Sequence, residues 1–179
     1  GGTFRVGVHD GSSTDSWDPA TTASILMIHS SHVARAYLTE ITNENTLGPD
    51  LATEWQALNE DGSEWRFELS RNATFHDGRA VTAKDVIASM NHHRGPDTTS
   101  AVAPLLADIT DIRADGDHAV IFTLSTGNAD LPYLLSDYHL VIQPAKDDGG
   151  IDWANGVGCG PYKVVDFKPG IGARFERHD

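Results

Sequence analysis

Residues 47–85 constrain the fold of this chain more than any other stretch, because they combine a strand pattern, a turn signal and a helix start. Residues 65–69 read Trp-Arg-Phe-Glu-Leu, so apolar and charged side chains alternate with the period of a strand that buries one face. The dipeptide Asp61-Gly62, which tolerates positive φ, separates them from the segment that contains Trp55. The pattern predicts a β-hairpin.

A helix is expected soon after this hairpin. The tripeptide His-Asp-Gly at 76–78 predicts a second turn. Thr82 then precedes an apolar helical pattern, and Asp85 follows three residues later, which is a short form of the capping box. The Gly-Pro pair at 95–96 is a stop signal for this helix.

The rest of the chain predicts a mixture of short strands and helices. The expected elements are strands at 3–8, 140–142, 163–167 and 173–175, a second hairpin at 109–114 and 118–124, and helices at 22–39, 101–106 and 130–135. Several hairpins without regular strand–helix alternation are typical of an α+β fold. We therefore expect a mixed or antiparallel sheet with flanking helices.

Three segments resemble one protein family in their order and spacing. They are residues 49–55 (Pro-Asp-Leu-Ala-Thr-Glu-Trp), 75–86 (Phe-His-Asp-Gly-Arg-Ala-Val-Thr-Ala-Lys-Asp-Val) and 158–162 (Gly-Cys-Gly-Pro-Tyr). They are similar to the P-x-L-A-x-x-W, F-x-D-G-x-x-x-T-A-x-D-V and Gly-Thr-Gly-Pro-Tyr segments of bacterial extracellular solute-binding proteins of the peptide/nickel class, family 5. The resemblance covers nearly the whole chain, with Cys159 in place of the usual Thr.

Proteins of this family are receptors that feed ABC importers, and they fold as two lobes around a ligand cleft. The resemblance implies that this chain is the N-terminal lobe portion of such a two-lobed periplasmic binding protein, with the second lobe absent. We expect residues 1–45 to form the first strand and helix of lobe one. Residues 46–157 would form an inserted subdomain, and residues 158–179 the strands that return into lobe one.

Composition limits what the chain can bind. The formal net charge is −13, from 13 Lys and Arg against 26 Asp and Glu, which disfavours nucleic acid as a partner. No Gly-x-Ser-x-Gly, His-Glu-x-x-His or P-loop motif is present, so we predict no enzymatic activity. One cysteine permits no internal disulfide and leaves the compartment open. Without a signal peptide in the sequence, we interpret Gly1 as a mature or trimmed N-terminus.

The resemblance places ligand contacts after the Asp-Pro pair at 18–19, which matches an Asp-Pro motif of the family, and in the polar loop before it. Hydroxyl groups there offer hydrogen bonds to a peptide, and apolar side chains offer tolerant walls. The alternative is that the threonines cap a helix and that the apolar residues belong to its core. The candidate ligand contacts are Ser13, Asp15, Trp17, Thr22, Ala23, Ile25 and Met27.

The nine histidines raise the question of a metal site. His29 and His32 lie three residues apart and His92 and His93 are adjacent, but a zinc site needs three or four converging ligands. No cysteine or carboxylate completes the first pair, so we predict no metal and no cofactor. Cys159 is expected to be a small packed side chain, because the neighbouring sequence offers no cation that would lower its pKa.

The sequence therefore predicts a periplasmic binding module. It would be the substrate-binding component of an ABC importer, which captures peptides or peptide-like solutes and delivers them to the membrane permease. Its expected partners are that ligand and the permease, with contact to the membrane only through the permease and none with nucleic acid. Hinge closure of two lobes over the ligand is the expected mechanism. The alternative is a secreted protein that binds a metal chelate or haem through histidines.

Overall fold

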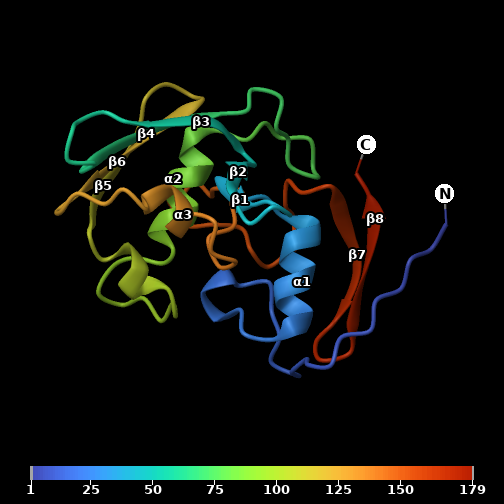
Figure 1. Ribbon diagram of the computed structural model, residues 1–179. Helices are drawn as coiled ribbons and strands as arrows, with labels where there is room; N and C mark the ends of the chain where they lie inside the picture. Colours follow the sequence, from blue (N-terminus) through green and yellow to red (C-terminus); the bar gives the residue numbers. More distant parts are fainter. Residues whose placement is uncertain (1, 179) are drawn as a thin grey trace.

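The computed structural model describes residues 2–178. In chain order its elements are η1 (Pro19–Thr21), α1 (Ile25–Ala34), β1 (Thr39–Ile41), β2 (Leu47–Pro49), β3 (Ala52–Ala57), β4 (Glu64–Leu69), α2 (Ala83–Asn91), η2 (Ala103–Leu106), β5 (Ile109–Ala114), β6 (Ala119–Leu124), α3 (Leu131–Leu134), β7 (Tyr162–Lys168) and β8 (Gly172–Arg177). Figure 1 shows a four-stranded sheet above α2 in one part, and α1 beside the β7–β8 hairpin in the other. The fold is α+β, as the sequence predicts.

The four-stranded sheet is antiparallel throughout, in the order β3-β4-β6-β5. Both predicted hairpins are present, with Asp61-Gly62 in the turn of the first and Asp115-Gly116 in the turn of the second. Gly62 between β3 and β4 has φ +68°, and Gly116 between β5 and β6 has φ +75°. Only glycine adopts this left-handed backbone without a steric cost, so these turns fix the register of both hairpins.

The core lies between this sheet and α2. Phe67 of β4 and Phe122 of β6 are fully buried, with ring centroids 5.4 Å apart in an edge-to-face arrangement. Val86 and Met90 of α2 pack against them from the same hydrophobic cluster. Each fully buried side chain of this size contributes about 1.5–3 kcal/mol, so the α2–sheet contact is a main source of stability.

The predicted capping box of α2 is present. The Asp85 carboxylate accepts hydrogen bonds from the backbone N–H and the hydroxyl of Thr82, both at 2.8 Å. Its other oxygen accepts from the backbone N–H of Ala145 at 2.8 Å. Asp85 therefore starts the helix and also ties it to a chain segment sixty residues away.

Two predicted strands are absent. Residues 3–8 belong to no strand, and Phe4 and Val6 are 89% and 67% exposed. Alternation alone does not make a strand, because the backbone also needs a neighbouring strand for its hydrogen bonds. Residues 140–142 are buried but form no ladder either. The backbone N–H of Ile142 donates to the carbonyl of Ala36 at 2.9 Å, so this segment crosses the core as an irregular extended chain.

The predicted helix at 22–39 is shorter than expected. It begins at Ile25, because Ser24 occupies the cap position, and it ends at Ala34. Arg35 leaves the helix with φ −129° and ψ 164°, and its side chain turns into the interior. The apolar spacing beyond residue 34 therefore belongs to a buried extended segment, which the helical pattern misassigned.

Candidate ligand-binding site

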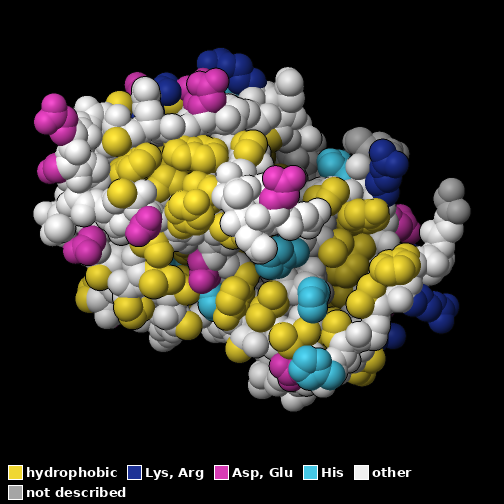
Figure 2. Space-filling view, viewed as in Figure 1, with side chains coloured by type: hydrophobic (Ala, Val, Ile, Leu, Met, Phe, Trp, Pro, Cys, Tyr) yellow, Lys and Arg dark blue, Asp and Glu magenta, His cyan; other side chains and the backbone are white. Residues whose placement is uncertain are grey.

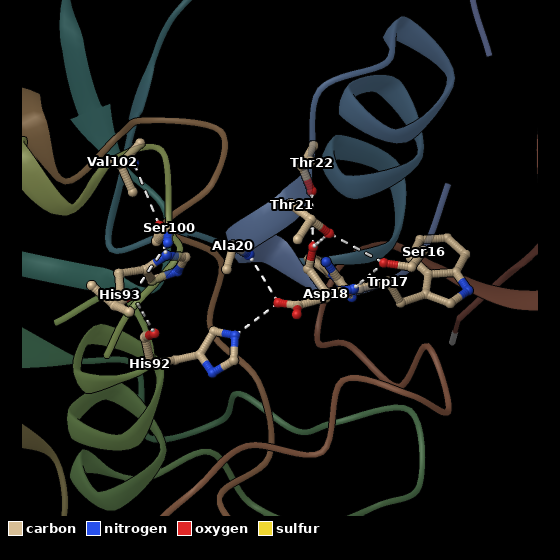
Figure 3. A network of polar contacts seen from close by, with 12 residues as sticks. Ser16, Trp17, Asp18, Ala20, Thr21, Thr22, His92, His93, Ser100 and Val102 are labelled. Atoms are coloured by element: carbon tan, nitrogen blue, oxygen red, sulfur yellow. Dashed lines mark hydrogen bonds and ion pairs between the residues drawn. The ribbon is translucent and has the colours of Figure 1, made fainter. Parts of the chain in front are cut away.

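Two consecutive helix starts shape the segment from residue 18 to residue 27, which we call the η1–α1 segment (Figure 3). Asp18 caps η1, and its Oδ1 accepts from the backbone N–H of Ala20 at 3.0 Å. Ser24 caps α1, and its Oγ accepts from the backbone N–H of Met27 at 3.2 Å. These caps hold the candidate ligand segment in a defined backbone conformation.

The seven candidate contact residues divide by exposure. Four are exposed or partly exposed: Ser13, Asp15, Ala23 and Ile25. Three are buried, with exposed fractions of 6% for Trp17, 4% for Thr22 and 1% for Met27. The buried three pack inside the protein, and among the candidates only the other four have surface that a ligand can reach. Ser24 caps α1, whereas the sequence pattern indicated a threonine for that role.

A buried arginine anchors the loop before this segment. Arg35 is 2% exposed, and its Nη2 donates to the backbone carbonyl of Trp17 at 2.5 Å. Its guanidinium lies 5.1 Å from the centre of the Trp17 ring, a cation–π distance. The amide of Gln143 satisfies the remaining donors only with its oxygen toward the guanidinium, 2.7 Å from Nη2 and 3.1 Å from Nε. Burial lowers the pKa of Arg35 to about 10, so the side chain stays charged.

Asp18 also reaches across to the second helix. Its Oδ1 lies 2.7 Å from Nε2 of His92, which follows the last turn of α2 (Figure 3). Burial alone would raise the pKa of Asp18, but the hydrogen bonds from His92 and Ala20 lower it overall. The Asp-Pro motif therefore joins the η1–α1 segment to the end of α2.

The next histidine is enclosed. His93 is fully buried, and its Nδ1 lies 2.7 Å from the hydroxyl of Ser100, while Nε2 has no hydrogen-bond partner among residues 2–178. Burial, and then the charges of His92 and His139, lower the pKa of His93 to about 4. The ring is therefore neutral near pH 7.

His139 fixes the other end of the η1–α1 segment. Its Nε2 lies 2.9 Å from the backbone carbonyl oxygen of Thr22, and its Nδ1 lies 2.7 Å from a carboxylate oxygen of Asp137. The residue is 4% exposed. His92 and His139 therefore hold the η1–α1 segment at Asp18 and Thr22, and Arg35 holds the loop before it at Trp17.

A family model for bacterial extracellular solute-binding proteins, family 5 (middle region), matches residues 46–179. The chain belongs to this family. The resemblance that the three sequence motifs indicated is therefore confirmed. The seven ligand contacts remain predictions.

Several individual proteins are similar to this chain in sequence or in structure. The HTH-type transcriptional regulator SgrR of Yersinia enterocolitica is 35% identical over 130 residues, which is 72% of this chain and 22% of that protein. The binding protein AgaA of A. tumefaciens R10, in complex with agropinic acid, has a TM-score of 0.83 at 25% identity, over 93% of this chain and 34% of its own. Haemophilus influenzae OppA in complex with RPPGFSPFR has a TM-score of 0.80 at 20% identity, over 93% and 37%. The chain spans between 22% and 37% of the length of each of these proteins.

The family 5 motif at 158–162 touches the end of α1 backbone to backbone. A Cβ at Gly160 would lie 2.5 Å from the backbone N of Arg35, and one at Gly158 would collide with the carbonyl oxygen of Ala34. The N–H of Gly160 donates to that same carbonyl at 3.1 Å. Glycine is required at both positions because no side chain fits.

His76, inside the second motif, joins it to the third. Its Nε2 lies 3.0 Å from the carbonyl oxygen of Gly160, and its Nδ1 lies 3.3 Å from the N–H of Gly158. One partner accepts and the other donates, so the ring is the neutral tautomer protonated on Nε2. Burial lowers the pKa of His76, in agreement with this assignment. This role of His76 was not predicted, because its partners lie more than eighty residues away in the sequence.

Cys159 lies between the two glycines, as predicted. The residue as a whole is partly exposed, but Sγ points inward to the carbonyl oxygen of Ile142 at 3.9 Å. Burial of the thiol raises its pKa to about 12. A thiol with this pKa carries almost no thiolate at neutral pH.

Histidines also gather on the surface over α1, among apolar side chains (Figure 2). His29 and His32 are exposed there, and Nδ1 of each lies near the backbone carbonyl of the residue four positions earlier. Within the described part of the chain, no group of three or more His, Cys, Asp or Glu residues is arranged to hold a metal ion. A groove of about 450 Å³ lies between α2 and the β5–β6 turn, and residues 18–27 contribute nothing to its lining.

Proposed function

We propose that this chain forms one wall of the ligand site in the substrate-binding component of an ABC importer. It would capture peptides or peptide-like solutes in the periplasm and deliver them to the membrane permease. Membership of family 5 carries this proposal. A neighbour in fold, OppA, is in complex with a peptide. Among residues 2–178, no helix has both the length and the apolar character needed to cross a bilayer.

The η1–α1 segment and the loop before it would supply this wall. We propose that the exposed or partly exposed candidates, Ser13, Asp15, Ala23 and Ile25, contact the ligand directly. The buried candidates Trp17, Thr22 and Met27 would act by supporting the backbone, because their side chains already pack against protein. A preorganised backbone reduces the ordering that ligand binding costs.

Isothermal titration with a pool of tri- to pentapeptides tests this function. The full-length gene product should bind the pool with a Kd of about 10 µM or tighter, whereas the 179-residue chain should bind much more weakly.

Ala23→Trp in the full-length protein should weaken binding at least tenfold by filling the ligand space. Ala107→Trp, at an exposed alanine after η2, is the matched control and should bind normally. Sub-micromolar binding by the 179-residue chain would contradict the single-wall arrangement.

A second function deserves a test, because the relative with 35% identity is named as a transcriptional regulator. In that case the chain would be the ligand-sensing part of a regulator. The chain itself is a poor DNA ligand, since its net charge is −13. Cell fractionation separates the two proposals: recovery of the gene product with the chromosome would favour the regulator, and recovery in the periplasmic fraction would favour the importer component.

A further inference from the structure

The two hydrogen bonds of His139 define its protonation state by geometry. Nδ1 faces a carboxylate oxygen of Asp137 at 2.7 Å, and Nε2 faces the carbonyl oxygen of Thr22 at 2.9 Å. Both partners are acceptors only. A neutral imidazole has one donor and one acceptor nitrogen, so it would turn a lone pair toward one of the two oxygens. The imidazolium form satisfies both.

His76 shows the opposite arrangement in the same protein. Its ring faces one acceptor, the carbonyl of Gly160, and one donor, the N–H of Gly158. His139 is buried and His76 is partly exposed, and the hydrogen-bond partners of the two rings fit different protonation forms. This comparison shows that the partners, and not burial alone, select the form of each ring.

We propose that His139 is a positioning residue that must be protonated to hold the backbone of the η1–α1 segment at Thr22, so that the ligand wall loosens when the ring loses its proton. This inference deepens the proposed function and rests on it for its effect on ligand. His139 acts through one hydrogen bond, from Nε2 to the carbonyl oxygen of Thr22, which lies between η1 and the Ser24 cap of α1.

The surroundings favour one positive charge at this place. The groups that interact with His139 itself are Asp137, Tyr138 and His93. Asp18 and His92 interact in turn with His93, and Tyr37 with Asp137. Burial alone would raise the pKa of Asp137, but hydrogen bonds from His139 lower it overall, so the carboxylate remains charged. His93 stays neutral, with a pKa near 4, and does not compete.

The direction of the pH effect follows from the donor count. The contribution of His139 is present while both ring nitrogens carry protons, and it is lost when Nε2 no longer donates to Thr22. Nδ1 keeps its proton beside the Asp137 carboxylate, which also accepts from the backbone N–H of His139 at 2.9 Å, so loss of the second ring proton leaves the carbonyl of Thr22 without its donor. A buried acceptor without a donor is unfavourable, so the η1–α1 segment then opens more often.

Nitrogen-15 NMR of the histidine rings tests the state of His139 directly in the wild-type protein, with His139→Gln identifying its signals. At pH 6 both ring nitrogens should show protonated shifts, while His76 should show the neutral Nε2–H pattern. A neutral His139 ring at pH 6 would overturn the proposal. This readout needs no ligand, and the protonation state is read in the wild-type protein.

Hydrogen exchange measures the mechanical consequence. From pH 6 to pH 9, exchange in the peptide covering residues 18–27 should become about tenfold faster after correction for the intrinsic rate. His139→Gln should remove this pH dependence, and His29→Gln, at an exposed histidine on α1, should keep it. Equal protection of residues 18–27 at both pH values in the wild-type protein would contradict the anchoring role.

The peptide-pool titration links the anchor to ligand. Affinity should fall about tenfold from pH 6 to pH 9 in the wild-type protein and in His29→Gln, and it should be independent of pH in His139→Gln. Affinity that is the same at both pH values in the wild type would overturn the effect on ligand. Absence of peptide binding at every pH would overturn the proposed function, whereas the NMR and exchange results decide the anchoring role by themselves.

Discussion

At the scale of single residues, the most constrained positions are those where backbone meets backbone. Gly160→Ala places a Cβ 2.5 Å from the backbone N of Arg35, and neither chain can yield without moving α1 or β7. We expect the free energy of unfolding to fall by about 3 kcal/mol or more, as for other overpacked sites. Urea unfolding measures this loss. Gly172→Ala is the matched control, because nothing lies within 4 Å of its Cβ; an equal loss there would refute the steric explanation.

His93 makes the stability sensitive to acid. Its pKa is lowered from 6.5 in the unfolded chain to about 4 in the folded protein. As the pH falls below 6.5, the unfolded chain takes up a proton first, so stability is full above 6.5 and is lost as the pH falls toward 4. We expect a loss of the order of 2 kcal/mol over this window.

His93→Asn tests this assignment by urea unfolding between pH 7 and pH 4. Asparagine can keep one polar atom near Ser100 but does not titrate, so the pH slope should flatten. His29→Asn, at an exposed position, should keep the wild-type slope. If both variants keep that slope, another group is responsible.

The thiol of Cys159 should react slowly. With a pKa near 12 and Sγ turned toward Ile142, it offers little thiolate to a reagent. A disulfide-exchange reagent such as DTNB at pH 8 should label the native protein at least a hundredfold more slowly than the protein in urea. Rapid labelling of the native state would show that the strand β7 and its neighbours open readily.

Residue roles could be predicted from sequence where the partners are neighbours along the chain. The turn at Gly62 and the pair formed by Thr82 and Asp85 depend on contacts within a few residues, and both are present. The roles of His76 and His139 depend on partners 84 and 117 residues away. No local pattern encodes such distances, so these anchors appear only in the folded chain.

At the scale of elements, Asp85 decides how firmly α2 begins. Asp85→Ala removes the acceptor for three donors, two from Thr82 and one from Ala145. We expect the free energy of unfolding to fall by about 2–4 kcal/mol, since a lost cap costs about 1 kcal/mol and each unpaired buried donor adds to it. Asp130→Ala, before α3, is a control without a side-chain cap hydrogen bond and should change stability little. Thermal unfolding compares the two.

The elements that the sequence misassigned share one cause. Apolar and polar side chains alternate in residues 3–8 as in a strand, but this segment pairs with no neighbouring strand. Residues 140–142 are apolar as in a buried strand, but they form no ladder, and the N–H of Ile142 donates to the carbonyl of Ala36. The hairpins were predictable because each brings its own partner. Isolated strands depend on segments far away, and α1 ends where Arg35 turns inward, which spacing along the helix does not reveal.

At the scale of the whole molecule, Arg35 joins parts that are distant in sequence. Its guanidinium contacts Trp17 before η1 and Gln143 in the core segment, and its backbone meets the glycines that precede β7. Arg35→Leu leaves two buried oxygens without donors. We expect the free energy of unfolding to fall by about 3–5 kcal/mol. Chemical denaturation measures it, with Arg71→Leu at an exposed arginine as the control.

The division of the chain at residues 45 and 157 stays a prediction. The variant Arg35→Leu tests this division. If Arg35 is the main polar link between the two parts, they should unfold less cooperatively in the variant than in the wild-type protein. Tryptophan fluorescence reports mainly Trp17 in one part and Trp55 and Trp65 in the other, together with Trp153. Coincident transitions by fluorescence and far-UV circular dichroism in the variant would argue against two separable parts.

The enclosed thiol at Cys159 has a practical consequence. It is the sole native cysteine, so a second one introduced at exposed Ser13 would be the reactive attachment point for a dye. The fluorophore would sit beside the proposed contact surface without a competing background label. Such a conjugate would turn the protein into an optical sensor, in which a change of emission screens unknown solutes one by one.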